Sequence, residues 1–415
     1  MTAPVRIPFP VVDEVSRHCL QEAEPETVHI EVHLPGPLDR ARLRKAFLEA
    51  LHRHPRILMR EARGPWYRRQ YEWELTPEPD VEVVTFAPPG PRALHDARTR
   101  ALTAAPPLSM SPPVRLEVVD SVLLLTINHT ALDGPACLRV LATAAELYGG
   151  RDNAPAAPPT RAAEPRQEAA DTPAGWSPPA RVAHGTPEPS PGNGLLVTEL
   201  PLPHRPKGSP YTVNDQLMVT TALTIAHWNR EHGARPRPLR ITMPVDDRPR
   251  DTTMPIGNGT RLVEVPYAPR ELDVTDMPAL LRRTAERTRA LKSLPRPQLG
   301  HGAALLTSPW APVTARAALT RTLRRAAAPW TSTTLLSNIG RIPYPLDFGE
   351  EAGRAHAVWF SAPARMPRGL TVTTASTAGR LHLALRWSKA LLSHGDGAHL
   401  RDLFEHYLHT TEVTP

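Results

Sequence analysis

Leu123-Leu-Leu-Thr-Ile-Asn-His129-Thr-Ala-Leu-Asp133-Gly134 is the stretch that decides the fold. The run from Val122 to Ile127 is short and rich in leucine and β-branched side chains, which predicts a buried strand. From Pro135 onward, apolar side chains recur at helical spacing until Gly149-Gly150, which predicts a helix. The stretch therefore predicts a strand that ends at a histidine, followed by a turn through Asp133-Gly134 into a helix.

The histidine at this strand end is a candidate general base. A neutral imidazole can take a proton from a hydroxyl or an amine as that group attacks a carbonyl. Asp133 could orient the ring, but we expect its carboxylate to point into the structure, where a buried carboxylate needs a cation. Arg248, at the end of a predicted strand in the second half, is the best candidate. The spacing of His129 and Asp133 is also common in purely structural pairs, so both interpretations stay open on spacing alone.

The composition indicates a two-lobed globular protein. The chain has 415 residues, of which 40% are hydrophobic and 22% charged, enough to bury a sizeable core in each of two lobes. The 50 prolines are about 12% of the chain, against an average near 5%. The net charge of +7 is not accompanied by aromatic side chains among the arginines, which argues against nucleic acid as a partner.

Other signals place the chain outside several classes. The two cysteines, Cys19 and Cys137, are far apart and support neither a disulfide framework nor a zinc site. There is no signal-peptide pattern and no apolar run long enough to span a membrane, so we expect a cytoplasmic protein, acting as a monomer. No third ligand stands near the histidine and aspartate, so no metal site is predicted. The glycine motifs of serine hydrolases, NTPases and dinucleotide-binding proteins are also missing from the sequence.

The chain divides into three parts. We expect a first lobe over 1–150, an extended linker rich in proline and alanine over 151–194 and a second lobe over 195–415. In the first lobe, alternating apolar and polar residues at 28–34 predict a strand with one buried face. Its other predicted elements are helices at 39–54 and 91–105 and strands at 67–74, 81–85, 114–119 and 122–127. The predicted elements of the second lobe are strands at 195–200, 239–245, 260–265, 334–340, 369–376 and 380–387 and helices at 216–231, 277–293, 313–328 and from about 397.

Asn128-His129-Thr-Ala-Leu-Asp133-Gly134 resembles the His-His-Xaa-Xaa-Xaa-Asp-Gly motif of a large acyltransferase superfamily. The superfamily contains nonribosomal-peptide condensation domains, polyketide-associated acyltransferases and wax-ester synthases, and chloramphenicol acetyltransferase shares the shorter core of the motif. Further matches fall in the expected order along the chain: Pro37 to Pro55, Asn214-Asp215, Pro244 to Pro249, Gly257-Asn258 and Ser337 to Gly340. The resemblance thus covers most of the chain.

The resemblance implies an α/β fold of two chloramphenicol-acetyltransferase-like lobes, a V-shaped pseudo-dimer with a central tunnel. It implies that His129 acts on the acceptor while an acyl thioester enters from the opposite side on a phosphopantetheine arm. Asp133 would keep the site in shape by pairing with Arg248, and Gly134 would allow the tight entry into the helix. Thr130, Ser337 and Asn338 would lie along the substrate channel.

Two residues depart from the family pattern. Asn128 stands where the first motif histidine is expected, and asparagine can donate and accept hydrogen bonds but cannot carry charge. Asp347-Phe348-Gly349 resembles the start of the condensation-domain latch, but Glu350-Glu351 follows in place of Trp-Gly. We therefore expect a relative that is not an ordinary module of a synthetase.

The resulting hypothesis is a free-standing acyltransferase of natural-product biosynthesis. It would join an acyl or peptidyl group, held on a carrier protein or on coenzyme A, to a small amine or alcohol. A basic helix with Arg321, Arg324 and Arg325 is a candidate docking face for an acidic carrier protein, although a plainly solvated face has the same composition. The alternatives are a protein that binds a carrier-tethered chain without transferring it, and an enzyme that uses the same tunnel for cyclisation or dehydration.

Overall fold

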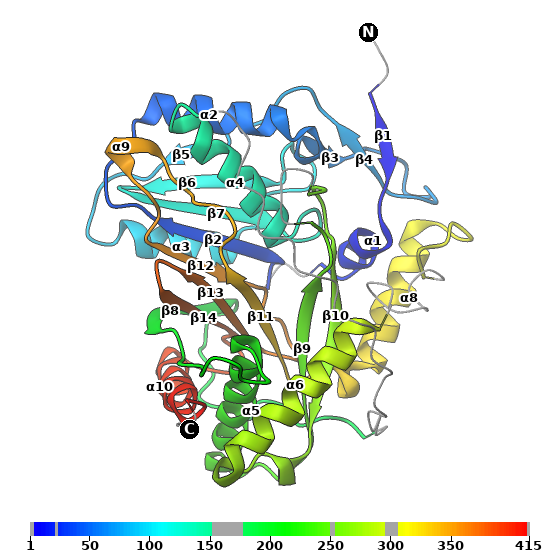
Figure 1. The fold of residues 1–415 in the computed structure, drawn as a ribbon. Helices are drawn as coiled ribbons and strands as arrows, with labels where there is room; N and C mark the ends of the chain where they lie inside the picture. The colour runs from blue at the N-terminus through cyan, green and yellow to red at the C-terminus, as the bar shows by residue number, and fades with distance from the viewer. Residues whose placement is uncertain (1–3, 21–23, 152–176, 250–253, 295–305, 413–415) are drawn as a thin grey trace.

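The computed structural model describes residues 4–20, 24–151, 177–249, 254–294 and 306–412. Figure 1 shows two layered units, one above the other, each formed by a sheet and the helices that cover it. A third, small sheet of β1 (Arg6–Pro8), β4 (Glu72–Leu75) and β3 (Met59–Glu61) lies beside the upper unit.

The sheet of the upper unit has the strand order β12-β2-β7-β6-β5. Its strands are β2 (Thr27–His33), β5 (Val84–Phe86), β6 (Val114–Val119), β7 (Val122–Asn128) and β12 (Ala357–Ser361). All its neighbouring pairs are antiparallel except β5 and β6. Helices α2 (Arg40–Arg53) and α4 (Gly134–Tyr148) cover one face, and α3 (Ala93–Thr103) contacts β2, β6 and β7 from the other.

Strand β2 is buried on both faces, whereas its alternating sequence predicted one exposed face. The polar face is covered by α3, which supplies partners for its side chains. Arg98 forms two hydrogen bonds with Glu31, at 2.8 and 2.6 Å, and His29 lies 2.9 Å from the carbonyl oxygen of Ala101. Burial alone would raise the pKa of Glu31, but hydrogen bonds from Arg98 and His33 lower it to about 2. Alternation could not reveal that a helix would cover the polar face.

The sheet of the lower unit has the order β10-β9-β11-β13-β14-β8. Its strands are β8 (Asn193–Pro201), β9 (Leu239–Asp246), β10 (Thr260–Tyr267), β11 (Thr334–Arg341), β13 (Leu370–Thr377) and β14 (Arg380–Ser388). Strand β11 runs parallel to β9 and β13, and the other neighbours are antiparallel. Helices α5 (Val213–Glu231), α6 (Met277–Ser293) and α10 (His394–Thr410) pack on this unit.

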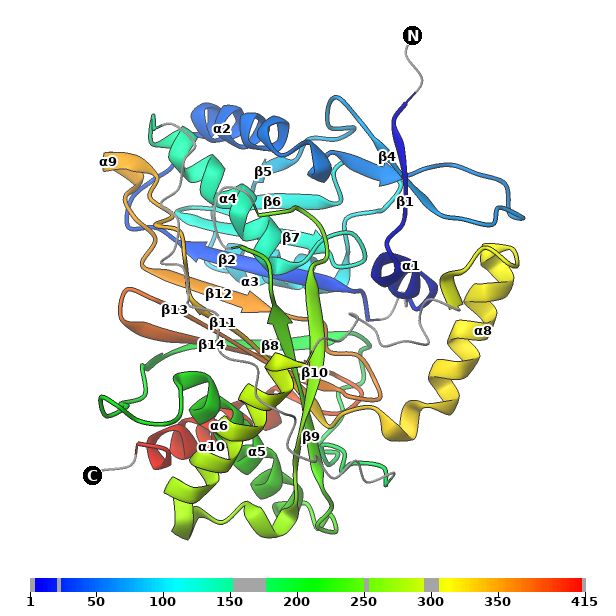
Figure 2. The same ribbon diagram turned by 45° about the vertical axis from the view of Figure 1, so that its right-hand side comes forward.

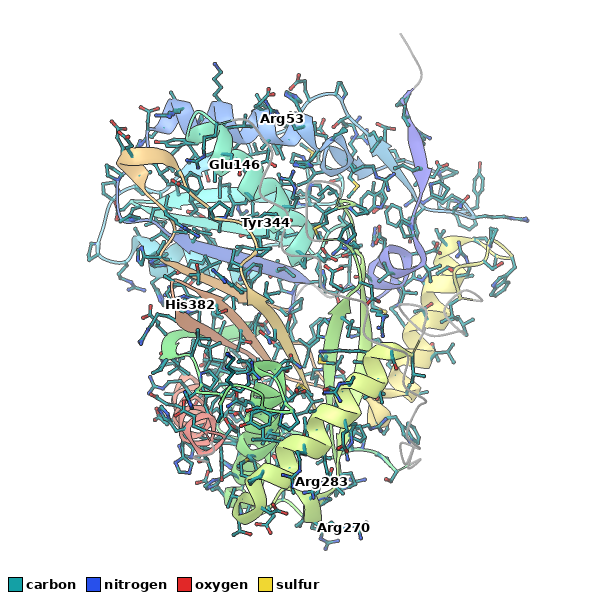
Figure 3. All side chains as sticks on the ribbon, in the orientation of Figure 1. Arg53, Glu146, Arg270, Arg283, Tyr344 and His382 are labelled. Carbon is teal, nitrogen blue, oxygen red and sulfur yellow. The ribbon has the colours of Figure 1, made fainter. Side chains whose placement is uncertain are left out.

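Residues 342–361 leave the lower unit and complete the upper one. Strand β12 pairs with β2, and the segment before it buries Tyr344, Leu346 and Phe348 in the upper core. This segment includes the short helix α9 (Gly349–Ala352), and the Phe348 ring packs edge-on against Tyr148, with 5.7 Å between ring centroids. Figure 3 shows Tyr344 inside the molecule, in contrast to Arg270 and Arg283 on its outer surface. The two units are therefore joined by an exchanged strand as well as by the chain between them.

The α/β fold class is as predicted, and most predicted elements are present within a few residues of their expected bounds. Helix α1 (Val11–His18), strand β12 and the small strands β1 and β3 were not predicted from the sequence. Part of the predicted linker, 152–176, lies outside the described residues. Residues 177–192 are described, and Ala180 and Val182 are buried in the lower core. The division at 1–150, 151–194 and 195–415 remains a prediction.

Helix α8 (Val313–Ala326) is less solvated than its basic sequence indicated. It packs beside α1 (Figures 1 and 2), and Arg316 is fully buried in an ion pair with Glu14. Arg321, Arg324 and Arg325 are exposed. Within the described ranges, no helix combines the length and apolar character needed to cross a membrane.

Two glycines in α10 allow a direct test of the packing of the lower unit. A Cβ atom at Gly397 would lie 2.5 Å from the fully buried ring of Trp387, whereas a Cβ at Gly395 would meet only the Ser393 hydroxyl, at 3.7 Å. We expect Gly397→Ala to lower the free energy of unfolding by about 1–3 kcal/mol through overpacking. Gly395→Ala should raise it slightly, by up to about 1 kcal/mol, because alanine favours the helix. Urea denaturation measures both; equal effects of the two substitutions would contradict this packing.

Candidate active site

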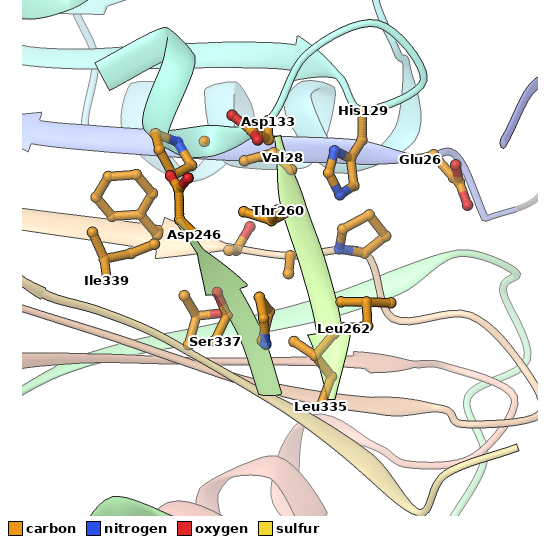
Figure 4. A pocket seen from close by; sticks show the side chains of 18 of the residues that line it. Glu26, Val28, His129, Asp133, Asp246, Thr260, Leu262, Leu335, Ser337 and Ile339 are labelled. Atoms are coloured by element: carbon orange, nitrogen blue, oxygen red, sulfur yellow. The ribbon is translucent and has the colours of Figure 1, made fainter. Parts of the chain in front are cut away.

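His129 lies in the turn between β7 and α4, with its ring on the wall of a cavity between the two units (Figure 4). Its backbone N–H donates to the carbonyl oxygen of Glu26 at 2.8 Å. Its Nδ1 lies 3.0 Å from the carbonyl oxygen of Leu132. Because a carbonyl can only accept, Nδ1 carries a proton, and in the neutral ring Nε2 is then the nitrogen with the lone pair. The local backbone therefore selects the tautomer that a general base requires.

Asn128 and Thr130 both point away from the cavity. The Asn128 side chain donates to the carbonyl oxygen of Pro106 at 2.9 Å and accepts from the Thr130 N–H at 3.1 Å. Thr130, which we expected along the substrate channel, is fully buried and is not part of the cavity wall. Asn128 is the last residue of β7, and Thr130 lies in the turn after it, where its hydroxyl is 3.3 Å from that of Ser16. Asn128 thus shapes the turn that carries His129.

The expected ion pair between Asp133 and Arg248 is present. One Asp133 oxygen accepts from the Ala136 N–H at 3.0 Å and so caps the N-terminus of α4. The other accepts from Arg248 Nη2 at 2.7 Å and from the Gly259 N–H at 2.8 Å. Both groups are largely buried, with 3% and 11% of their side chains exposed. Asp133 therefore holds the start of α4 against the lower unit.

Every N–H of the Arg248 guanidinium has an acceptor. Nε and Nη2 also contact the two carboxylate oxygens of Asp246, at 2.9 and 3.0 Å, and Nη1 donates to the carbonyl oxygens of Pro255 and Gly257. A Cβ atom on Gly259 would overlap the guanidinium, so only glycine lets the backbone come this close. Burial would lower the pKa of Arg248, but hydrogen bonds and charge from Asp246 and Asp133 raise it above its usual value. The protein itself therefore satisfies all the hydrogen-bond donors of this guanidinium.

A second set of polar groups supports the histidine turn from behind. The Asn258 side-chain amide donates to the carbonyl oxygen of Thr130 at 3.0 Å, to that of His129 at 3.3 Å and to the Asp13 carboxylate at 2.9 Å. Asp13 also accepts from Trp73 Nε1 at 2.9 Å. Burial raises the pKa of Asp13 to about 7, against the opposing effect of these two hydrogen bonds. The Gly257-Asn258 match was visible in the sequence, but the contribution of Asp13 was not.

The cavity has a volume of about 310 Å³ and is lined by residues of both units. The expected channel residues Ser337 and Asn338 are on its wall, and Figure 4 shows Ser337 among the side chains of the lower unit, with His129 and Asp133 on the upper side. The side-chain oxygen Oδ1 of Asn338 accepts from the Gly340 N–H and the Thr374 hydroxyl, at 2.9 and 3.1 Å. Gly134 also lines the cavity, and a Cβ there would touch the Phe360 ring at 3.4 Å.

The sequence did not predict the charged residues on the cavity wall beside His129, although it singled out one of them, Arg324, for a docking face. Glu26 lines the cavity close to His129 (Figure 4) and forms an ion pair with Arg365, another wall residue. Arg324 and Arg368 line the same cavity. Glu26, Arg324 and the segment that holds Arg365 and Arg368 are far apart in the sequence, so only the fold brings them together.

No protein-family model matches the chain. Two curated relatives from Mycobacterium tuberculosis, the uncharacterized proteins MT2362 and Rv2305, are each 29% identical over 377 residues. Each match covers 82% of this chain and 84% of the relative.

Solved structures share the fold at low sequence identity. A variant of the starter condensation domain of rhizomide synthetase, in complex with C8-CoA, has a TM-score of 0.66 at 15% identity, covering 96% of this chain and 94% of that one. The trichothecene 15-O-acetyltransferase TRI3 of Fusarium sporotrichioides has a TM-score of 0.65 at 12% identity, covering 99% and 96%. The first condensation domain of the calcium-dependent antibiotic synthetase, in complex with a substrate analogue, has a TM-score of 0.63 at 14% identity, covering 98% and 97%.

The chain therefore has the fold of condensation domains, which TRI3 shares. The fold implied by the motif resemblance is confirmed.

Replacing Asp133 tests the ion pair that joins the units. Asp133→Asn retains an oxygen for capping α4 but removes the charge that faces Arg248, and breaking a buried pair costs about 3–5 kcal/mol. Because Asp246 still pairs with Arg248, we expect the lower end, about 3 kcal/mol of unfolding free energy. Asp96→Asn is the control: its side chain is 49% exposed and its ion-pair partner, Arg92, is 76% exposed, so the effect should stay within about 0.5 kcal/mol. An Asp133→Asn protein as stable as the parent would refute the structural role of this pair.

The Asp13 carboxyl makes stability depend on pH. Its pKa rises from 3.8 to about 7 on folding, so the folded state binds more protons across that range. Stability linked to Asp13 is present below this window and is lost as the pH rises through it. A shift of about three units corresponds to about 4 kcal/mol. We expect Asp13→Asn to weaken this loss, so that the variant gains a few kcal/mol relative to the parent between about pH 4 and pH 7. Parallel profiles of unfolding free energy against pH would contradict the shift.

Proposed function

We propose that the protein is a condensation-type acyltransferase. It would transfer an acyl or peptidyl group from a thioester to the amine or hydroxyl of a small acceptor, with His129 as the general base. The observation that carries the proposal is the orientation of His129: Nδ1–H is used by the Leu132 carbonyl, and the ring lies on the wall of a cavity between the units. The condensation-domain fold supports the same reaction class.

The proposed reaction moves one proton through His129. The acceptor N–H or O–H donates its proton to Nε2 as its lone pair attacks the thioester carbonyl carbon. The tetrahedral intermediate then collapses, the C–S bond breaks, and the leaving sulfur takes the proton from Nε2. The products are an ester or an amide and a free thiol, and His129 returns to its starting tautomer.

Asp133 and Arg248 would act on geometry in this scheme. They hold the start of α4 and so fix the Leu132 carbonyl that accepts from His129. The Ser337 hydroxyl lines the cavity and makes no hydrogen bond with any described residue. It is therefore the neutral donor we assign to the substrate carbonyl.

The acyl donor we propose is a phosphopantetheine thioester, carried by a carrier protein or by coenzyme A. A condensation domain of the same fold was solved with C8-CoA, which supports an acyl thioester as the donor class. Arg321, Arg324 and Arg325 are exposed on α8, and Arg324 also lines the cavity. An acidic carrier protein at this helix would therefore stand at an edge of the cavity, with charge complementarity guiding the encounter.

The asparagine in place of the first motif histidine is compatible with acyl transfer. The Asn128 side chain is buried and bonded to Pro106 and Thr130, so the replacement takes no functional group away from the cavity wall. This placement favours transfer over binding alone. Cyclisation in the same cavity is the second candidate; it requires the nucleophile and the thioester to belong to one substrate.

Substitution of His129 tests the proposal. We expect His129→Ala to lower the rate of thiol release from a panel of acyl thioesters, offered with amines and alcohols, by about 10²- to 10⁴-fold. His409→Ala is the matched control, because His409 is exposed near the end of α10, and it should not change the rate. Thiol release that is unchanged in His129→Ala would refute the general-base role. Mass spectrometry of the products distinguishes transfer from cyclisation, since a cyclic product contains no added acceptor.

A further inference from the structure

Three arginines line the cavity, and they differ in whether a carboxylate pairs with their charge. Arg365 and Arg368 come from the segment between β12 and β13, and Arg324 comes from α8. The carboxylates on the wall are Glu26, Asp133 and Asp246. Asp133 and Asp246 both contact Arg248, which leaves Glu26 to face the three wall arginines.

Arg365 is neutralised by the protein itself. It forms an ion pair with Glu26 and donates to the carbonyl oxygen of Cys19 at 2.8 Å. Glu26 also accepts from the Ser16 hydroxyl. The charges of Glu26 and Arg365 therefore balance each other, and we do not expect this pair to bind a charged ligand.

Arg368 has no such partner among the described residues. Its Nε and Nη2 donate to the Ser332 hydroxyl at 3.2 and 2.9 Å, and Nη2 also lies 3.4 Å from the Thr242 hydroxyl. Both partners are neutral. Nη1 makes no hydrogen bond with the described part of the chain, and no described carboxylate forms an ion pair with this guanidinium. Arg368 is partly buried, and burial lowers its pKa to about 10; the positive charge of Arg324 acts in the same direction, against the opposing charge of Glu264.

Arg324 adds a second unbalanced charge. It reaches the cavity from the exposed half of α8 and has no ion pair with a described residue. With Arg365 paired to Glu26, the two remaining arginines leave this part of the wall with a charge of +2. Arg248 is the contrasting case, because every one of its donors is satisfied by the fold.

We propose that Arg368 and Arg324 bind an oxyanion group of the substrate, at the end of the cavity away from Asp133. Thr242, which contacts Arg368, pairs in register with Leu335, and Figure 4 shows Leu335 across the cavity from His129. Thr242 also lies four residues before Asp246 on β9, about 13 Å along the strand. The inference rests on the proposed function, since it describes a substrate of that cavity.

Two sources can supply this oxyanion. It is the phosphate of the pantetheine arm if the arm reaches the arginines, or a carboxylate of the acyl chain if the chain does. Guanidinium groups bind both through charge-assisted hydrogen bonds. In either case the cavity selects an anionic substrate over a neutral one of the same shape.

Non-reactive thioethers of pantetheine separate the two sources. One probe carries an alkyl chain, the second carries the alkyl chain with a terminal carboxylate at graded lengths, and the third is the alkyl thioether of phosphopantetheine. Binding of each is measured by isothermal titration calorimetry. We expect one anionic probe to bind about tenfold more tightly than the neutral probe, and Arg368→Gln to remove that advantage. Tighter binding of the carboxylate probe would show that the arginines bind the acyl chain. Tighter binding of the phosphopantetheine probe would show that they bind the phosphate of the arm.

The controls keep the test independent of catalysis and of folding. Arg324→Gln should reduce the same advantage, whereas Arg325→Gln, on the same helix but not on the cavity wall, should not. The probes contain no thioester that could be cleaved, so failure of the general-base role leaves this result intact. If Arg368→Gln does not fold, the comparison of probes in the parent and in Arg324→Gln still decides. Equal affinity for neutral and anionic probes in the parent, or an anion preference that survives both substitutions, would overturn the proposal.

Discussion

The structure around the cavity depends on the way two carboxylates and one backbone turn enclose Arg248. Asp246 precedes it on the same segment, and Asp133 reaches it from the start of α4 in the other unit. A buried guanidinium is costly unless each of its donors is paired, so the backbone carbonyls of Pro255 and Gly257 are as necessary as the two carboxylates. Gly259 is needed as well, because a Cβ there would overlap the guanidinium. One satisfied cation thereby sets the position of α4, and through the Leu132 carbonyl it sets the tautomer of His129.

The parts of this arrangement that follow from local pattern were predictable from the sequence. The apolar run 122–127 and the helical spacing after Pro135 predicted a strand, a turn and a helix, and the structure has β7 and α4 there. The motif resemblance predicted that Asp133 would meet Arg248 across the chain, and they are in contact. It also led to the condensation-domain fold. Such features can be predicted because the residues that determine them are close in sequence or belong to a motif.

The rest depends on contacts that no spacing encodes. Strand β12 is a five-residue run in a proline-rich region, and it becomes a strand because β2 offers it an edge. Asp13 acquires its raised pKa from burial between Trp73 and Asn258, and Asn258 is 245 residues away in sequence. We expected Thr130 on the channel from its position in the motif, but the turn after β7 buries it, with its N–H on the Asn128 side chain and its hydroxyl beside that of Ser16. In each case tertiary packing decides the environment of the residue, and a single sequence does not contain that information.

The two charged regions of the cavity differ in a way that separates architecture from recognition. At Arg248 two carboxylates and two backbone carbonyls satisfy every donor, so the shape of the site is held whether or not a substrate is present. At Arg368 a partly buried guanidinium has only hydroxyl partners among the described residues, a condition that lowers stability unless something else compensates it. A cation retained at such a cost is explained when the compensating anion belongs to the ligand, because the same missing contact that weakens the empty site then strengthens binding. Arg248 thus helps to position His129, and Arg368 selects the substrate by its charge.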